Sequence, residues 1–142
     1  MIKIRHTGIV TKNLKQSLNF WVQILGFKVK KTLNESGELI DKIIGYKNVK
    51  VKTLKLADSY GNLIEILYFF NSPKVKKSKI KPYTNGYTHI SLTVKNIQFI
   101  YKILKKKNFF FNSLPKKSVD GKVLMTYCKT PEGAFLELVQ EL

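Results

Sequence analysis

The sequence predicts an α+β fold built from two β-α-β-β-β modules in tandem. The first observation is an internal repeat, because the only two histidines of the 142 residues, His6 and His89, begin the similar segments H-T-G-I-V-T-K-N-L and H-I-S-L-T-V-K-N-I. The second is that each segment is followed, several dozen residues later, by a glycine four positions before a glutamate, Glu65 or Glu137. The third is that each half contains one segment with helical periodicity among segments that alternate like strands.

In the first half, residues 2–10 alternate as a strand does, and Asn13 offers a side-chain cap to a helix that ends at Gly26. A polar stretch at 34–37 leads into a short helical piece that ends near Gly45. The remaining strands alternate apolar and polar residues or lie between turn residues, and they are expected at 27–30, 50–56 and 63–69. The first half therefore has the order β-α-β-β-β.

The second half repeats this order. A strand is expected at 87–94, Asn96 caps the next helix, and Asn108 takes the place that Gly26 has in the first half. The remaining strands are expected at 109–111, 122–129 and 134–140. Each predicted element thus has a counterpart in the other half.

The length and composition predict one soluble domain over residues 1–142, with module 1 at 1–70, a proline-containing linker at 71–86 and module 2 at 87–142. The hydrophobic fraction of 44% and the charged fraction of 25% are ordinary for a globular protein. No apolar run approaches the roughly 20 residues that cross a bilayer. The single Cys128 cannot form an internal disulfide, so we expect a cytoplasmic protein with no membrane association.

The net charge of +17 could indicate a nucleic-acid partner, but the kind of basic residue argues against it. Arg5 is the only arginine, so 25 of the 26 basic residues are lysines. They are spread along the chain, with short clusters at 74–77 and 105–107. Specific phosphate or base recognition usually also uses the guanidinium group. We favour a lysine-rich solvated surface without a specific nucleic-acid partner, whose field helps to attract a small anionic substrate.

The repeated histidines and glutamates predict a metal site. His6 and His89 lie on strand faces with small or polar neighbours, whereas Glu65 and Glu137 interrupt apolar strands, where an unpaired carboxylate is costly to bury. A lone strand histidine is more often a hydrogen-bonded core residue, and a lone strand glutamate often points to solvent. Because the repeat pairs all four, we predict that they bind one divalent ion. Two imidazoles and two carboxylates suit Ni, Zn, Co, Mn or Fe(II) better than Ca or Mg.

Three segments resemble the signatures of the vicinal-oxygen-chelate superfamily, which includes glyoxalase I, methylmalonyl-CoA epimerase, extradiol dioxygenases, and fosfomycin and bleomycin resistance proteins. These segments are H-T-G-I at 6–9, S-L-N-F-W at 17–21 before L-G-F at 25–27, and P-E-G-A-F-L-E-L at 131–138. The resemblance covers nearly the whole chain. It implies that the two βαβββ modules form a partly closed, eight-stranded, mixed, barrel-like sheet with helices outside, and that the protein is a homodimer.

The resemblance also narrows the range of activities that we expect. Glyoxalase I and the acyl-CoA epimerases use four ligand positions, on which His6, Glu65, His89 and Glu137 fall. Extradiol dioxygenases and fosfomycin-modifying enzymes lack a ligand at the place of Glu65, epimerases commonly have glutamine there, and bleomycin-binding members usually lack the metal set. The glutamate therefore favours the glyoxalase I pattern.

Two positions depart from bacterial glyoxalase I, which typically places an arginine and an asparagine where this sequence has Val10 and Phe69. Both residues serve glutathione there, so another thiol adduct or acyl compound is an alternative substrate.

We expect a metal-dependent lyase or isomerase of glyoxalase I-like type, in which Glu137 or Glu65 moves a proton through an enediolate or enolate. The resemblance to glyoxalase I slightly favours Glu137. The alternatives are an acyl-CoA epimerase, an Fe(II) dioxygenase or a non-catalytic, resistance-type protein that binds a small molecule. No organic cofactor is expected.

Overall fold

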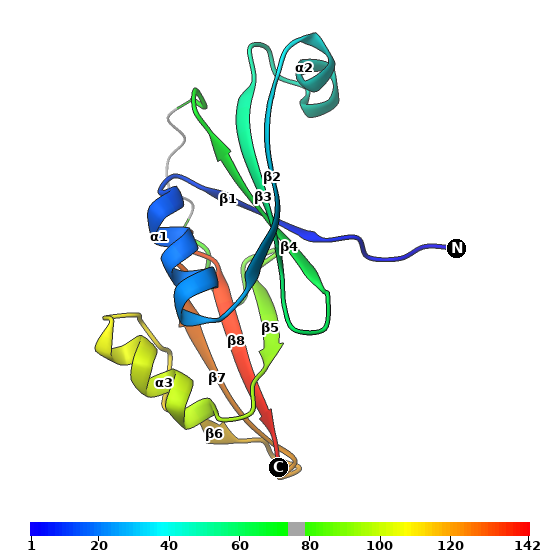
Figure 1. The fold of residues 1–142 in the computed structure, drawn as a ribbon. Helices are drawn as coiled ribbons and strands as arrows, with labels where there is room; N and C mark the ends of the chain where they lie inside the picture. The colour runs from blue at the N-terminus through cyan, green and yellow to red at the C-terminus, as the bar shows by residue number, and fades with distance from the viewer. Residues whose placement is uncertain (74–78) are drawn as a thin grey trace. The chain divides into compact units, whose positions relative to one another are not determined.

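The computed structural model describes residues 1–73 and 79–142, which fall into two compact units, Met1–Lys76 and Lys77–Leu142 (Figure 1). Each unit contains one four-stranded mixed sheet, with strand order β1-β4-β3-β2 in the first and β5-β8-β7-β6 in the second. The two orders are equivalent, because each unit places its last strand beside its first. The predicted α+β class is confirmed. The lysine cluster at 74–77 and that part of the expected linker lie outside the described residues.

Unit 1 has the predicted order, including the short helix that ends at Gly45. Its elements are β1 (Thr7–Thr11), α1 (Leu14–Leu18), the π-helical η1 (Asn19–Ile24), β2 (Lys28–Ser36), α2 (Glu38–Ile44), β3 (Lys50–Ala57) and β4 (Leu63–Phe69). The side chain of Asn13 accepts a hydrogen bond from the Gln16 amide, as expected of an N-cap. Gly26 follows the helix with φ at +80°, a conformation that glycine adopts without strain.

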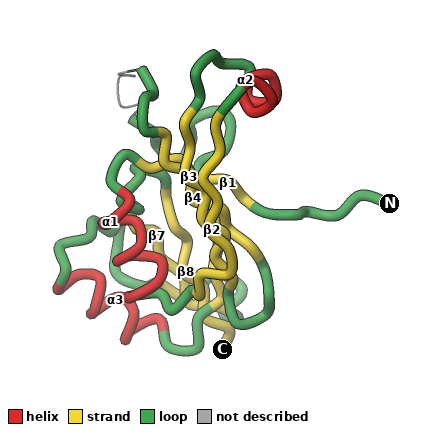
Figure 2. Tube along the Cα trace, turned by 45° about the horizontal axis from the view of Figure 1, so that its top comes forward, coloured by secondary structure: helices red, strands yellow, loops and turns green. Residues whose placement is uncertain are grey.

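Unit 2 repeats these features. Its elements are β5 (His89–Thr93), α3 (Ile97–Lys106), β6 (Lys116–Lys117), β7 (Val123–Lys129) and β8 (Phe135–Glu141). Asn96 accepts from the Phe99 amide, and Asn108 has the left-handed φ of 63° that its place after the helix predicts. Helix α3 lies beside β8 (Figure 2), and the Ile97 amide at its start donates a hydrogen bond to the side-chain oxygen of Gln140 on β8.

Three strand predictions were wrong in extent or place. The first strand begins only at Thr7, because its partner β4 starts at Leu63. The residues before β4 form a closed turn, in which the Asp58 amide donates a hydrogen bond to the Asn62 carbonyl. The strand expected at 27–30 continues to Ser36, because the eight residues of β3 pair with it despite its polar end. Tertiary pairing overrides local propensity in both cases.

The strand expected at 109–111 is reduced to one bridge, between Phe111 and Cys128. The Phe109 amide instead bonds to the Leu104 carbonyl at the end of α3, and the Phe111 ring packs on Tyr101 at 4.7 Å. This segment therefore completes the helix end, and Lys116–Lys117 becomes the fourth strand of the sheet. Among the described residues, no helix combines the length and apolarity that crossing a membrane requires.

Each sheet buries one face around apolar residues that flank the central glutamate of its last strand. In unit 1, Ile64 and Ile66 are buried on either side of Glu65. In unit 2, Leu136 and Leu138 are buried on either side of Glu137. Because side chains alternate along a strand, both glutamates point to the opposite face from these core residues.

Candidate functional site

The first half-site joins the end of a loop to the middle of a strand. His6 is the last residue before β1, and its Nε2 lies 3.5 Å from Oε1 of Glu65 on β4. The side chains are 29% and 13% exposed, so both are largely shielded yet reachable. Gly8 pairs in register with Glu65, so no side chain stands between the carboxylate and the histidine two residues earlier.

The second half-site repeats this arrangement in unit 2. His89 is the first residue of β5, and its Nε2 lies 3.9 Å from Oε2 of Glu137 on β8. The exposed fractions are 39% for the histidine and 13% for the glutamate. Ser91 pairs in register with Glu137, as Gly8 does with its counterpart. Each unit therefore brings together one histidine and one glutamate of the sequence-predicted set.

The two imidazole rings are held differently. The Thr88 hydroxyl is hydrogen bonded to Nδ1 of His89 at 3.0 Å. In the tautomer that donates this bond, Nε2 carries the lone pair that a metal ligand uses. His6 has no such support, because its Nδ1 is buried and lacks a hydrogen-bond partner within the described part of the chain. Such an orphaned nitrogen costs about 1–3 kcal/mol unless it gains a partner.

The residue opposite each glutamate in the sheet differs between the units. Lys55 on β3 pairs in register with Glu65, and its Nζ lies 3.6 Å from Oε2. Tyr127 on β7 pairs in register with Glu137 and donates a hydrogen bond to its carboxylate. Burial, followed by that hydrogen bond and the charge of Glu137, raises the pKa of Tyr127 above its usual value. The tyrosine ring also contacts the His89 ring edge-on at 5.3 Å.

Sequence reasoning missed both of these neighbours. The signal was available, because the tight turn at 58–62 fixes the register between the strands that flank it. Counting outward from that turn places Lys55 opposite Glu65, and the corresponding turn at 130–133 places Tyr127 opposite Glu137.

Each half-site has the chemistry and spacing of a pair of metal ligands. Two ligands bonded to one ion at about 2.1 Å, with an angle of about 90–109° between the bonds, lie about 3.0–3.4 Å apart. The nitrogen–oxygen distances of 3.5 and 3.9 Å are slightly longer, and both exceed a hydrogen bond. Among the described residues, no group of three or more His, Cys, Asp or Glu side chains is placed to hold a metal ion, so each half-site stands as a pair.

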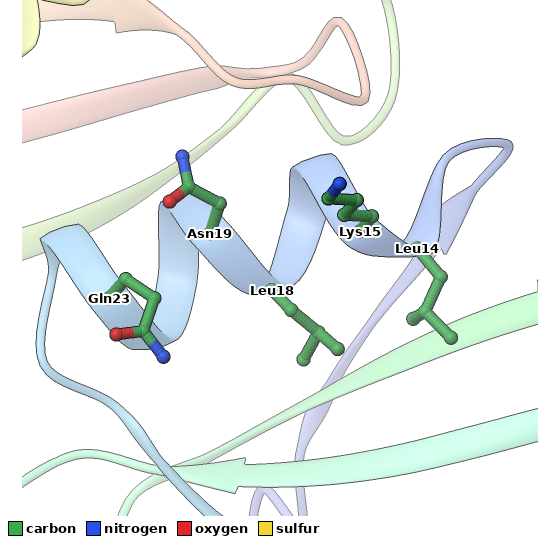
Figure 3. Close-up of a pocket in the computed structure, with 5 residues that line it drawn as sticks. All are labelled: Leu14, Lys15, Leu18, Asn19 and Gln23. Carbon is green, nitrogen blue, oxygen red and sulfur yellow. The ribbon is translucent and has the colours of Figure 1, made fainter.

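A separate hollow of about 480 Å³ lies along the helix of unit 1 (Figure 3). It is lined by residues of one helical segment: Leu14, Lys15, Leu18, Asn19 and Gln23. It contains none of the histidines and glutamates, and its lining of two leucines, two amides and one lysine has no carboxylate, imidazole or thiol to bind a metal ion.

Comparison with known proteins identifies relatives over the whole chain. The chain is 28% identical to lactoylglutathione lyase of Schizosaccharomyces pombe, over 98% of this chain and 47% of that enzyme, so it spans about half the length of that relative. It is 26% identical to the mitochondrial methylmalonyl-CoA epimerase of Dictyostelium discoideum, over 98% of this chain and 78% of the epimerase.

The fold is also that of a known structure. A glyoxalase family protein from Bacillus cereus superposes with a TM-score of 0.90 at 20% identity, over 100% of this chain and 95% of that protein. Residues 3–138 match the family model described as Glyoxalase/Bleomycin resistance protein/Dioxygenase superfamily. A match over nearly the whole length, together with a fold of this kind, establishes that the chain belongs to this superfamily.

Proposed function

We propose that this protein is a metal-dependent lyase or isomerase of glyoxalase I-like type, and that its four metal ligands are His6, Glu65, His89 and Glu137. The observation that carries this proposal is that each unit holds a histidine Nε2 next to a glutamate carboxylate at equivalent register positions. A structural role for one such pair would be unremarkable. A metal centre with four ligands requires two such pairs, and the two units supply equivalent pairs of one imidazole and one carboxylate each.

The residues fit a divalent ion of the Ni, Zn, Co, Mn or Fe type. The donors are two imidazole nitrogens and two carboxylates, without a thiolate. The gap between each histidine Nε2 and its glutamate oxygen indicates that these groups are not hydrogen bonded to each other. When bound, such an ion supplies positive charge that stabilises the negative charge of an enediolate or enolate and thereby acidifies the neighbouring C–H bond.

Glu137 is the residue that accepts and returns the proton in this proposal. The Tyr127 hydroxyl holds its carboxylate through a hydrogen bond, and that neighbour is neutral. The charge of Glu65, by contrast, is already offset by the Lys55 ammonium at 3.6 Å. The neutral hydroxyl that orients Glu137 suits this carboxylate for proton transfer. The cation beside Glu65 suits that carboxylate for a permanent role as a metal ligand.

The substrate is proposed to be a small anionic molecule, for which the glutathione contacts of bacterial glyoxalase I are replaced here by Val10 and Phe69. The two relatives act, by their names, on lactoylglutathione and methylmalonyl-CoA, so a lyase and an epimerase are both represented. Val10 is 51% exposed and Phe69 is partly exposed. At the two positions that resemble the glutathione contacts of bacterial glyoxalase I, this chain therefore has apolar surface. An acyl-CoA epimerase is therefore the second candidate. We propose a homodimer, in which the two pairs meet within one chain or across two.

The test begins with elemental analysis of protein purified without a chelator, followed by NMR of lactoylglutathione and methylmalonyl-CoA in deuterated water. We expect about one divalent ion per pair of half-sites and deuterium incorporation next to a carbonyl group. Glu137→Gln should reduce incorporation by about 10²–10⁴-fold. Glu141→Gln changes an exposed carboxylate on the same strand and is the matched control.

Saturable binding without any exchange in the unmodified protein would favour a resistance-type binding protein. Iron as the metal, with oxygen consumption, would favour a dioxygenase. Equal effects of the Glu137 and Glu141 substitutions on deuterium incorporation would show that Glu137 is not the base.

A further inference from the structure

We propose that Lys55 is a substrate-binding residue that recognises a carboxylate next to the metal-chelating oxygens of the substrate. This inference rests on the proposed function above, and it assigns the anionic substrate a contact in unit 1. The observation behind it is the position of an ammonium group beside Glu65, on the sheet face that carries the first half-site.

The contact between Lys55 and Glu65 leaves the ammonium protons available. The distance of 3.6 Å is an ion-pair distance, too long for a hydrogen bond. Within the described part of the chain, Nζ of Lys55 has no hydrogen-bond acceptor, although its side chain is only 23% exposed. An ammonium this shielded from water is stabilised by acceptors, and an incoming carboxylate supplies them.

The surrounding charges also favour an anion. Lys31 on β2 pairs in register with Lys55, so two like charges stand opposite each other with Glu65 as the adjacent carboxylate. When a divalent ion is held by two carboxylates and two neutral imidazoles, the centre has no net charge. Lys55 then gives the centre and its surroundings one net positive charge, which favours an anionic substrate, and lysine binds carboxylates as a point charge.

The second unit shows that the fold does not need this cation. Tyr127 occupies the equivalent register position, and there a neutral hydroxyl completes the same sheet beside the same kind of glutamate. Only the half-site of unit 1 has this ammonium group. Because unit 2 forms the same sheet without it, we infer that Lys55 serves substrate binding more than the packing of the sheet.

The experiment uses the full chain loaded with Co(II) and two chelators that differ by one carboxylate, acetohydroxamate and malonomonohydroxamate, with affinities measured by calorimetry. We expect the carboxylate-bearing probe to bind more tightly to the unmodified protein. Lys55→Met should weaken that probe by about tenfold or more and leave acetohydroxamate unchanged, because one charge-assisted contact is lost. Lys55→Arg should keep the preference. Lys52→Met, on the opposite face of β3, is the matched control.

The outcomes separate the two proposals. If acetohydroxamate binds but the extra carboxylate brings no gain, or if Lys55→Met weakens both probes equally, the role of Lys55 is wrong and the metal centre stands. If neither cobalt nor acetohydroxamate binds, the proposed function itself is wrong. Displacement of malonomonohydroxamate by malate, which has a second carboxylate beside its chelating hydroxy acid group, or by methylmalonyl-CoA would support the proposal if Lys55→Met weakens it, and would assign the carboxylate to a small free acid or to an acyl thioester.

Discussion

The two halves of this chain share a scaffold but differ in the residues around their glutamates. Both place the last strand beside the first, and both set a histidine next to a glutamate at 3.5 or 3.9 Å. In unit 1 the glutamate faces Lys55, and the histidine precedes its strand with an unpartnered ring nitrogen. In unit 2 the glutamate faces Tyr127, and the histidine begins its strand with Thr88 bonded to its ring.

The difference shows that the backbone and the side-chain environment are specified separately. Strand alternation and register determine where a carboxylate lies, and these are the same in both halves. One substitution on the neighbouring strand then decides whether that carboxylate has an ammonium or a hydroxyl beside it. A repeated fold can thus supply two ligand pairs of unequal character to one site.

The largest effect is expected from the shared scaffold. Ile66 and Leu138 occupy equivalent core positions, and neither side chain has exposed surface. Ile66→Ala and Leu138→Ala should each lower the free energy of unfolding by about 2–5 kcal/mol, measured by urea denaturation. Val119→Ala, at a fully exposed position, should change it by less than about 0.5 kcal/mol. A small loss at only one of the two core positions would break the equivalence of the halves.

The next effect concerns the support of the histidine rings and depends on the proposed metal centre. Thr88→Val removes the hydrogen bond to His89 and should lower divalent-ion affinity by about 10–100-fold. Arg5, at the equivalent place before His6, forms no hydrogen bond with the ring Nδ1 among the described residues, so Arg5→Met should have little effect. Competition with a fluorescent chelator measures both affinities. Equal losses would mean that the two rings are held alike.

A third comparison uses the buried thiol of unit 2. Cys128 has no exposed surface, and burial raises the pKa of its thiol from 9.0 to about 12, whereas the equivalent Leu56 cannot ionise. Below pH 9 the thiol is protonated in the folded and unfolded states, and its stabilising effect is complete. Between pH 9 and 12 the unfolded state loses the proton first, so this contribution to stability is lost as the pH rises.

Relative to Cys128→Ala at the same pH, the unmodified protein should therefore lose about 1.4 kcal/mol between pH 8 and 10. Urea denaturation of both proteins at the two pH values measures this difference and cancels the titration of the lysines and tyrosines. Parallel losses in the two proteins would show that the thiol ionises as readily in the folded state.

The smallest effect should be the same in both halves. Asn13→Ala and Asn96→Ala each remove one side-chain acceptor from a helix N-terminus, and each should lower the free energy of unfolding by about 1 kcal/mol. Serine at either position should retain most of the stability, because its hydroxyl also accepts from the amide. Thermal denaturation of the four variants gives the measurement, and a much larger loss at one cap would show that the two helices contribute unequally.

The sequence alone determined the features that depend on nearby residues. The caps at Asn13 and Asn96, the left-handed residues after each helix and the turns before the glutamates were all predicted correctly. The pairing of each histidine with its glutamate was also predictable, because the repeat carries both partners. Convergence of the two pairs on one ion remains a prediction.

Only the tertiary structure decided where the strands end and what faces the glutamates. The strand predicted at 2–10 loses its first residues because β4 offers no partner before Ile64. The apolar run at 109–111 completes a helix end and joins the sheet at a single bridge, between Phe111 and Cys128. Lys55 and Tyr127 likewise gained their places through strand register. Backbone hydrogen bonds in a sheet come from distant parts of the chain, so the length of a strand and its cross-strand neighbours are set by its partner as much as by its own residues.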